Sequence, residues 1–201
     1  MGDFSILKAD CDSQARTGLL RTEHGEIETP VFMPVGTSGA VKGITPGQLR
    51  DVGAKVVLAN TYHVMLRPGI EVVESLGGLH GLMSWHGPIL TDSGGYQVFS
   101  LSELAKIDDN GVEFSSHVDG SRLFLDAEKA TEIQNRLGAD IIMCLDQCTA
   151  FPVDADELKT AVNRTINWAE RCKKAHSKPE QHLFGIVQGA IDPEMREYCV
   201  Q

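Results

Sequence analysis

The sequence contains no long apolar run. No stretch of its 201 residues approaches the roughly 18 consecutive apolar residues of a membrane span. The first ten residues also lack the apolar centre of a secretory signal peptide, and they carry two acidic residues, Asp3 and Asp10. These absences argue against the membrane-spanning and secreted classes, so we expect a cytoplasmic protein with no membrane partner.

Cysteine is scarce and irregularly placed. The five cysteines are an odd number with wide spacings, which does not fit a disulfide framework, and we therefore expect a reducing compartment. Cys144 and Cys148 are four residues apart, but they lie in an apolar run rather than in a metal-binding loop. The sequence favours buried small side chains here over a metal site.

Positive charge is also in short supply. The chain has 18 Lys and Arg residues against 28 Asp and Glu residues, which gives a formal net charge of −10. A general nucleic-acid-binding surface would be basic, so this balance argues against such a surface on these residues.

Short apolar runs alternate with stretches of helical spacing. Most runs are apolar throughout, which is typical of parallel strands covered on both faces. The predicted strands are Val31–Gly36, Val56–Asn60, Ile89–Ser93, Ile141–Asp146 and Leu183–Gly189. About five strand–helix units fit this length, whereas a (β/α)8 barrel has eight units in roughly 250 residues. The fold class is therefore α/β, as either an open doubly wound sheet or a barrel cut off part-way.

Capping residues and glycines bound five predicted helices. These run from Thr45 to near Gly53, over Ile70–Leu76, from Asp126 to Gly138, from about Ala155 to His176, and onward from Asp192. The third is predicted to face the core through Ala127, Ala130, Ile133, Gln134 and Leu137. The fourth is predicted to do so through Leu158, Val162, Thr165, Ile166, Ala169 and Cys172.

Two segments interrupt this alternation. Phe4 to Glu28 predicts short antiparallel strands with a turn at residues 23–25. Val112–Val118 and Arg122–Leu125 flank Asp119-Gly120, which predicts a hairpin inserted after the third strand. The sequence has no internal repeat and no linker, so residues 1–201 are expected to belong to one domain.

Polar residues follow four of the predicted strands at their carboxyl ends, where α/β proteins place their sites. The first of each group are Asn60, Asp92, Asp146 and Gln188. A carboxylate that closes an apolar strand is poorly solvated, so it needs a partner or a chemical task. These positions are the candidates for a functional site.

The segment from Asp92 to Gln97 is the most informative of these. Gly94 and Gly95 allow a ligand to approach the backbone, and Tyr96 offers a ring that can stack on a planar ligand. A tight turn capped by Asp92 accounts for the same residues equally well. A phosphate-binding loop is the weaker interpretation, because no glycine spacing of that kind accompanies the pair.

Asp146 and Gln188 extend this segment toward a purine pocket. A carboxylate can accept two hydrogen bonds from a guanine-like base, and an amide can donate and accept at once. Two carboxylates can also take different acid–base tasks if their surroundings separate their pKa values. His63, His86 and His117 have no partner at metal-ligand spacing, and we interpret them as structural.

Five blocks of the sequence match one family. They are Pro30–Thr37, Asn60–Gly69, Leu90–Ser100, Asp146–Thr149 and Val187–Gly189. They resemble the tRNA-guanine transglycosylases, also called queuine tRNA-ribosyltransferases, of bacterial type. The resemblance covers the whole chain, and the Asp-Ser-Gly-Gly-Tyr-Gln block at residues 92–97 is highly specific.

The resemblance implies a (β/α)8 TIM-type barrel, of which residues 1–201 would be the N-terminal portion with about the first five strand–helix units. The family also carries a structural zinc ion on a Cys-x-Cys-x-x-Cys and His set, which we expect beyond Gln201, so no metal ligands are expected in this chain. The nucleophilic aspartate is expected beyond Gln201 as well. We therefore expect a fragment that is inactive alone, with the basic tRNA surface mostly in the other part.

The implied activity is replacement of guanine at the wobble position of GUN-anticodon tRNAs by preQ1, which is 7-aminomethyl-7-deazaguanine, in queuosine biosynthesis. The family reaction is a double displacement through a covalent ribosyl-enzyme. Implied partners are that tRNA, preQ1 or guanine, and a second copy in a homodimer. Two alternatives are a non-catalytic partner subunit and an unrelated α/β barrel enzyme. The intact motif around Asp92 argues against the first, and the lack of a phosphate cradle against the second.

The resemblance also assigns roles to single residues. Asp92 matches the general acid/base, Asp146 and Gln188 match residues that hydrogen-bond the base edge, and Tyr96 matches the stacking ring. The full substrate-binding set is Asp92, Ser93, Gly94, Gly95, Tyr96, Asp146, Gln188 and Gly189. Asn60 and Gln97 would hold Asp92 from behind. Cys148 matches a cysteine typical of bacterial members, which favours preQ1 over queuine.

Overall fold

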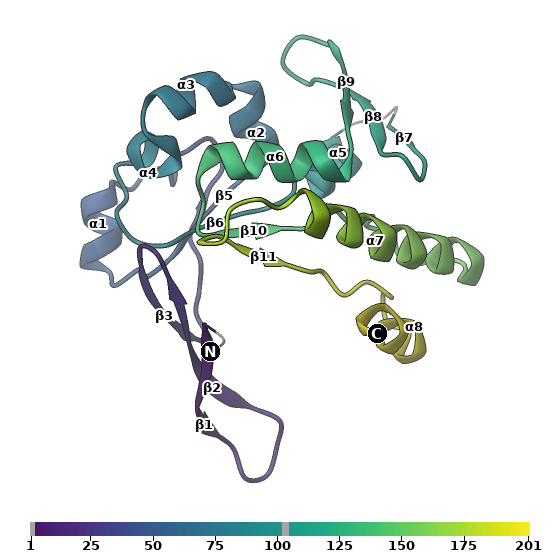
Figure 1. Ribbon diagram of the computed structural model, residues 1–201, viewed down its shortest axis with the longest axis horizontal. Helices are drawn as coiled ribbons and strands as arrows, with labels where there is room; N and C mark the ends of the chain where they lie inside the picture. The colour runs from purple at the N-terminus through teal and green to yellow at the C-terminus, as the bar shows by residue number, and fades with distance from the viewer. Residues whose placement is uncertain (1–2, 102–104) are drawn as a thin grey trace.

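The computed structural model describes residues 3–101 and 105–201. Their strands form three sheets, of which the central one is parallel and the other two are antiparallel. Figure 1 shows the longer helices along one side of the central sheet, with the N-terminal sheet projecting from the other side. This arrangement confirms the predicted α/β class. None of the helices in the described part of the chain has the length and apolar character needed to cross a membrane.

The central sheet contains the five predicted strands in sequential order. They are β4 (Val35–Gly36), β5 (Val57–Ala59), β6 (Ile89–Thr91), β10 (Ile141–Met143) and β11 (His182–Phe184). The spatial order is β11-β10-β6-β5-β4, so each strand pairs with its predecessor in this series. A doubly wound sheet reverses its order at a switch point. These strands have no such reversal, and the described sheet stays open with β4 and β11 as its edges.

The strands are shorter than the apolar runs that predicted them. The first run was predicted as Val31–Gly36, but only its last two residues pair in β4, and the run Leu183–Gly189 leaves the sheet after Phe184. The apolar character continues beyond the paired segments because some of the following loops are buried too: Cys144 and Leu145, after β10, are 3% and 0% exposed.

All five predicted helices form. They are α1 (Pro46–Asp51), α3 (Ile70–Ser75), α6 (Ala127–Leu137), α7 (Ala155–Ala175) and α8 (Pro193–Val200). Thr45 and Gln48 make a capping box at the start of α1. Asp126 caps α6, which ends at Gly138 with a φ of 72°. The predicted inward face of α6 is buried, whereas two members of the predicted α7 face, Ile166 and Ala169, are only partly buried.

Three short helices were not predicted. They are α2 (Thr61–Leu66), α4 (Gly78–Met83) and α5 (Gly95–Leu101). Each has six or seven residues, too few to give a helical period. The pair Gly77-Gly78 reads as the end of α3, but it also begins α4, with Gly77 as the N-cap at a φ of 85°. Because glycine weakens helices, tertiary packing must stabilise these turns.

Both predicted antiparallel segments are present. The N-terminal sheet consists of β1 (Phe4–Ala9), β2 (Arg16–Thr22) and β3 (Gly25–Thr29), with the predicted turn between β2 and β3. The inserted hairpin consists of β8 (Val112–Ser115) and β9 (Arg122–Leu125). An additional strand, β7 (Lys106–Ile107), pairs with β8 and was not predicted, because two residues show no alternation.

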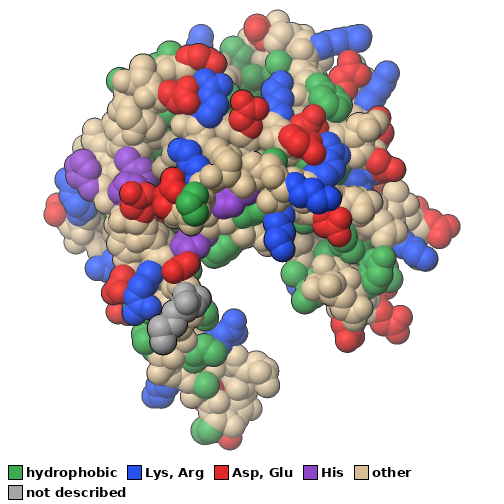
Figure 2. Space-filling view, in the orientation of Figure 1, with side chains coloured by type: hydrophobic (Ala, Val, Ile, Leu, Met, Phe, Trp, Pro, Cys, Tyr) green, Lys and Arg blue, Asp and Glu red, His purple; other side chains and the backbone are tan. Residues whose placement is uncertain are grey.

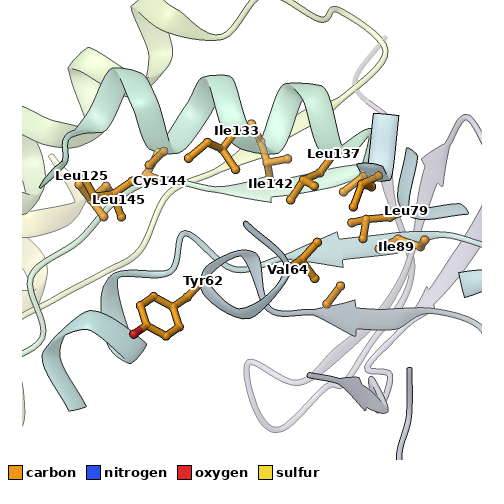
Figure 3. Close-up of a cluster of buried hydrophobic side chains, with 14 of the residues drawn as sticks. Tyr62, Val64, Leu79, Ile89, Leu125, Ile133, Leu137, Ile142, Cys144 and Leu145 are labelled. Carbon is orange, nitrogen blue, oxygen red and sulfur yellow. The ribbon is translucent and has the colours of Figure 1, made fainter. Parts of the chain in front are cut away.

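The core has one cluster on each face of the central sheet. The cluster beneath the helices includes Val57, Ile89 and Ile142, and Figure 3 shows part of it between the sheet and α6. The cluster on the other face includes Leu90 and Ile141 with two side chains of the N-terminal sheet, Leu20 and Ile27. Neighbouring residues of one strand enter different clusters, as the strand pleat requires. The N-terminal sheet therefore covers the face of the central sheet that the helices leave free.

Charged side chains of both signs are mixed over the visible surface. Figure 2 shows a hollow between the projecting N-terminal sheet and α8, and no broad basic field on this face. The mixture agrees with the net charge of −10.

Candidate functional site

The carboxylate of Asp92 lies directly after β6 and is held by the beginning of α2. The side-chain amide of Asn60 donates to Oδ2, and the backbone N–H of Thr61 donates to Oδ1 at 2.8 Å. The Thr61 hydroxyl also donates to the Asp92 carbonyl oxygen at 2.6 Å. The first two bonds fix the orientation of the carboxylate, and the third ties the backbone after β6 to α2.

Burial controls the protonation of Asp92. It raises the pKa of this carboxyl group, while hydrogen bonds from Asn60, Thr61, Gly94 and Gln97 oppose the rise. The other amide atom of Gln97, Oε1, is buried and has no hydrogen-bond partner among the described residues. A carboxyl group with a raised pKa exchanges a proton at physiological pH more readily than an exposed aspartate.

Asp146 follows β10 and is 7% exposed. The amide of Gln188 donates to Oδ2 at 2.7 Å, and two longer contacts of 3.5 Å come from the Ser93 hydroxyl and the Cys148 thiol. Burial raises the pKa of Asp146, and these three partners oppose the rise. The contacts join the segments that follow β6, β10 and β11.

Cys148 behaves as a thiol in this setting. Burial and the neighbouring charge of Asp146 raise its pKa to about 12, so it stays protonated at neutral pH. It is only partly buried, and the interpretation of Cys148 as a buried small side chain is therefore wrong, whereas Cys144 is fully buried as expected.

Gly94 and Gly95 are packed against neighbouring backbone. Gly94 has a φ of 81°, and a Cβ there would lie 3.4 Å from the backbone nitrogen of Tyr62. A Cβ on Gly95 would lie 3.0 Å from the carbonyl oxygen of Asp146. The positive φ favours glycine at position 94, and the close approach of Asp146 favours it at position 95, reasons that the sequence interpretation did not include.

The remaining predicted residues lie on either side of the carboxylates. Tyr96 stands on α5 with 60% of its surface exposed. Gly189 has a φ of 124°, and a Cβ there would lie 2.6 Å from the backbone nitrogen of Arg196, so this glycine lets α8 approach. Among the described contacts, Asn60 and Gln97 gather at Asp92, while Ser93, Cys148 and Gln188 gather at Asp146.

The predicted structural histidines differ among themselves. Nδ1 of His117 lies 2.9 Å from the hydroxyl oxygen of Tyr62, which ties the inserted hairpin to α2. His63 meets His117 edge-on with ring centroids 5.5 Å apart, and burial lowers the pKa of His63. His86 is exposed rather than packed.

A glutamine on α6 was missed as a positioning residue. Gln134 is fully buried, and its Oε1 accepts from the Thr91 hydroxyl and from the backbone N–H of Met143, both at 3.0 Å. Its amide donates to the Met143 carbonyl at 2.9 Å. Gln134 therefore fixes β6 against β10, and with them the two carboxylates. The sequence offered one signal for this role, which is that a polar residue stands among the inward-facing positions of the helix.

One group among the described residues could hold a metal ion, namely His24, His80 and Asp140. It contains no cysteine, so it does not fit the structural zinc of the resemblance, which needs three thiolates and one imidazole. The sequence analysis did not identify this group.

A sequence model of the family described as queuine tRNA-ribosyltransferase matches residues 10–201. The chain belongs to this family. A curated relative named queuine tRNA-ribosyltransferase from a Thermoanaerobacter species is 54% identical over 199 residues. Relatives of the same name from Halothermothrix orenii and Geobacillus kaustophilus are 51% identical over 198 residues and 54% identical over 194. The family resemblance of the sequence blocks is thus confirmed.

The alignments cover this chain almost completely and the relatives only partly. They include 98%, 98% and 96% of this chain, but 53%, 53% and 51% of the three relatives. The chain therefore spans about half the length of the curated relatives it matches.

Proposed function

We propose that the protein to which this chain belongs replaces a guanine in tRNA by a 7-deazaguanine base. The observation that carries the proposal is a pair of shielded carboxylates, Asp92 and Asp146, after adjacent parallel strands in a chain of the queuine tRNA-ribosyltransferase family. The names of the relatives support the same activity.

We infer that the central sheet is the first part of a (β/α)8 barrel. Sequential order of five parallel strands is the winding of such a barrel, and the open edges at β4 and β11 are where further strands would add. The relatives are about twice as long as this chain, which leaves enough length for the remaining units. On this view residues 1–201 are the N-terminal portion of one barrel domain.

The base is proposed to bind at Asp146. Its carboxylate would accept from N1–H and the exocyclic amine of a guanine-type base. Gln188, which already donates to this carboxylate, would add its free carbonyl oxygen, and Ser93 and Gly189 would line the same pocket. The exposed ring of Tyr96 would stack on the base.

Asp92 is proposed as the general acid/base. An aspartate from the other part of the protein would bond to the ribose C1′ while the bond from C1′ to guanine breaks, and Asp92 would supply a proton to the departing guanine. The incoming base would then give a proton to Asp92 as it displaces the enzyme carboxylate. Asn60 and Gln97 would hold Asp92 in position throughout.

The other expected features are carried over from the family. They are a GUN-anticodon tRNA as substrate, a homodimer and a cytoplasmic location. Cys148 is the reason to expect preQ1 as the incoming base. A structural zinc ion on cysteine and histidine ligands would belong to the part of the family length that this chain does not span. No step proposed here uses that ion.

Base exchange in the whole protein tests this function. Labelled guanine or preQ1 would be supplied with a GUN-anticodon tRNA to wild type, Asp92→Asn and the matched surface variant Asp51→Asn, which changes an exposed aspartate at the end of α1. We expect label in the tRNA with wild type and Asp51→Asn, and a loss of at least about 100-fold with Asp92→Asn.

Equal incorporation by Asp92→Asn would remove this residue from the chemistry while keeping the base-exchange activity. No incorporation by folded wild type with either base would contradict the proposed function itself and would favour the non-catalytic partner subunit.

A further inference from the structure

Three metal-binding side chains meet at the end of the central sheet opposite to Asp92 and Asp146. Asp140 directly precedes β10, whereas Asp146 follows it. His24 belongs to the turn between β2 and β3, and His80 lies on α4. Three elements that are far apart in the sequence therefore contribute one candidate ligand each.

The spacing of the ligand atoms suits one small cation. Nδ1 of His24 lies 2.8 Å from Oδ1 of Asp140, and Nε2 of His80 lies 3.2 Å from Oδ2. Ligand atoms around a tetrahedral zinc ion, at about 2.0–2.1 Å from the metal, lie about 3.3 Å apart. The two imidazole rings are now stacked with centroids 3.7 Å apart. The His24 side chain is 36% exposed, which leaves its ring room to turn so that both lone pairs converge.

The carboxylate is already oriented by its surroundings. The Asp140 side chain is fully buried, and its two oxygens accept hydrogen bonds from the backbone N–H groups of His24, at 3.1 Å, and Ile89, at 2.8 Å. Backbone donors of this kind orient carboxylate ligands in metal sites. Nε2 of His80 is buried 3.2 Å from Oδ2 of this carboxylate and, among the described residues, has no other polar partner.

The same contacts affect the protonation of Asp140. Burial alone would raise its pKa, but hydrogen bonds from His80, Ile89 and His24 hold the pKa well below the usual range of an aspartate.

The cluster opens into a pocket of about 220 Å³. The pocket is also lined by Glu23, Lys178 and Glu180, and it has room for the water molecules that would complete the coordination. Two imidazoles and one carboxylate are a ligand set for zinc and its transition-metal neighbours, whereas magnesium and calcium prefer oxygen ligands alone. We propose that His24, His80 and Asp140 bind a divalent transition-metal ion, Zn²⁺ in particular, that links the N-terminal sheet to α4 and β10.

The test is a metal count on the whole protein, stripped with a chelator and reloaded with Co²⁺ or Zn²⁺ alone. His24→Ala removes a ligand from a surface turn, and His86→Ala is the matched control because His86 is exposed and lies outside the cluster. We expect wild type and His86→Ala to bind one more equivalent than His24→Ala, or to bind it at least about 100-fold more tightly. Zn²⁺ should raise the melting temperature of wild type more than that of His24→Ala.

Absorption spectra of the cobalt form identify the site. A site of nitrogen and oxygen ligands adds d–d bands without a thiolate-to-metal charge-transfer band, so His24→Ala should lose d–d intensity and keep any thiolate band. His80→Asn provides a second ligand variant and should behave in the same way. The proposal is overturned if all four proteins bind the same number of equivalents with the same spectra, which would leave the cluster as a hydrogen-bonded contact between its three elements.

Discussion

Replacement of Asp146 by asparagine should separate base recognition from folding. In the structure, Oδ2 accepts from the Gln188 amide at 2.7 Å, while Oδ1 has only the contact of 3.5 Å with the Ser93 hydroxyl. The asparagine oxygen can take the place of Oδ2 and keep the bond from Gln188. Its new NH2 group then faces Ser93, whose hydroxyl can accept. The protein therefore tolerates the change, and the loss falls on the ligand.

The same substitution should weaken the binding of a guanine-type base more than it weakens the fold. The N1–H and amine of the base need acceptors, and Asp146→Asn offers an NH2 donor in place of one carboxylate oxygen. A hydrogen bond to a charged group contributes about 1.5–3 kcal/mol. The substitution removes one such bond and places the asparagine NH2 donor opposite a donor of the base, so we expect a total cost of about 2–4 kcal/mol. At about 1.4 kcal/mol for each factor of ten, base binding should weaken by roughly 30-fold to 700-fold.

Steady-state kinetics of base exchange measure this effect. In the whole protein, KM for the base should rise by that factor, whereas KM for the tRNA and the unfolding midpoint in urea should stay near wild type. The surface variant Asp51→Asn should change none of these values. An unchanged KM for the base in a folded Asp146→Asn protein would refute the assignment of this carboxylate to the base edge.

Two further substitutions test the packing around these groups. Gly95→Ala should destabilise the fold by about 1–2 kcal/mol, because its Cβ would press on the backbone oxygen of Asp146 at 3.0 Å. Gly47→Ala, where the nearest atom is 3.8 Å away, should not, and urea unfolding compares the two. Asp140→Ala should lower the free energy of unfolding by about 3–5 kcal/mol at neutral pH, because it leaves hydrogen-bond donors around this buried carboxylate without an acceptor. Because the pKa of Asp140 is lowered in the fold, this difference should shrink below about pH 4, and an equal difference at every pH would contradict it.

The sequence was sufficient to predict the strands and the polar residues that follow them. Short runs that are apolar throughout are easy to recognise as strands of a parallel sheet, and a carboxylate at the end of such a run stands out, as Asp92 and Asp146 do. Capping residues such as Thr45 and Asp126 located the helix ends equally well. These features depend on neighbouring residues, which is why one sequence reveals them.

Features that depend on distant residues were missed. Asp140 reads as an ordinary residue before a strand, yet it contacts His24, which is 116 residues away in the sequence. Gln134 reads as one member of a helix stripe, yet its amide joins two strands. The helix α5 begins with a glycine that local propensity treats as a turn residue. In each case tertiary contacts, rather than a local pattern, decide the structure.

Asp92 and Asp146 have similar surroundings, which affect the protonation of both carboxyl groups. Within the described part of the chain, neither Asp92 nor Asp146 forms an ion pair with Lys, Arg or His, and burial raises the pKa of both. The hydrogen bonds to their ionised forms come from neutral donors, such as Asn60 at the first and Gln188 at the second.

A ligand that brings N–H donors therefore adds hydrogen bonds that the fold itself does not give to these carboxylates. Donation to Asp146 would favour its charged form and so tighten the binding of the base that donates. Because Asp92 forms no ion pair with the described residues, its protonated and ionised forms are closer in free energy than those of an exposed aspartate. A group that must gain and release a proton in each exchange needs this property. A lysine or arginine paired with either carboxylate would stabilise its ionised form and remove that property.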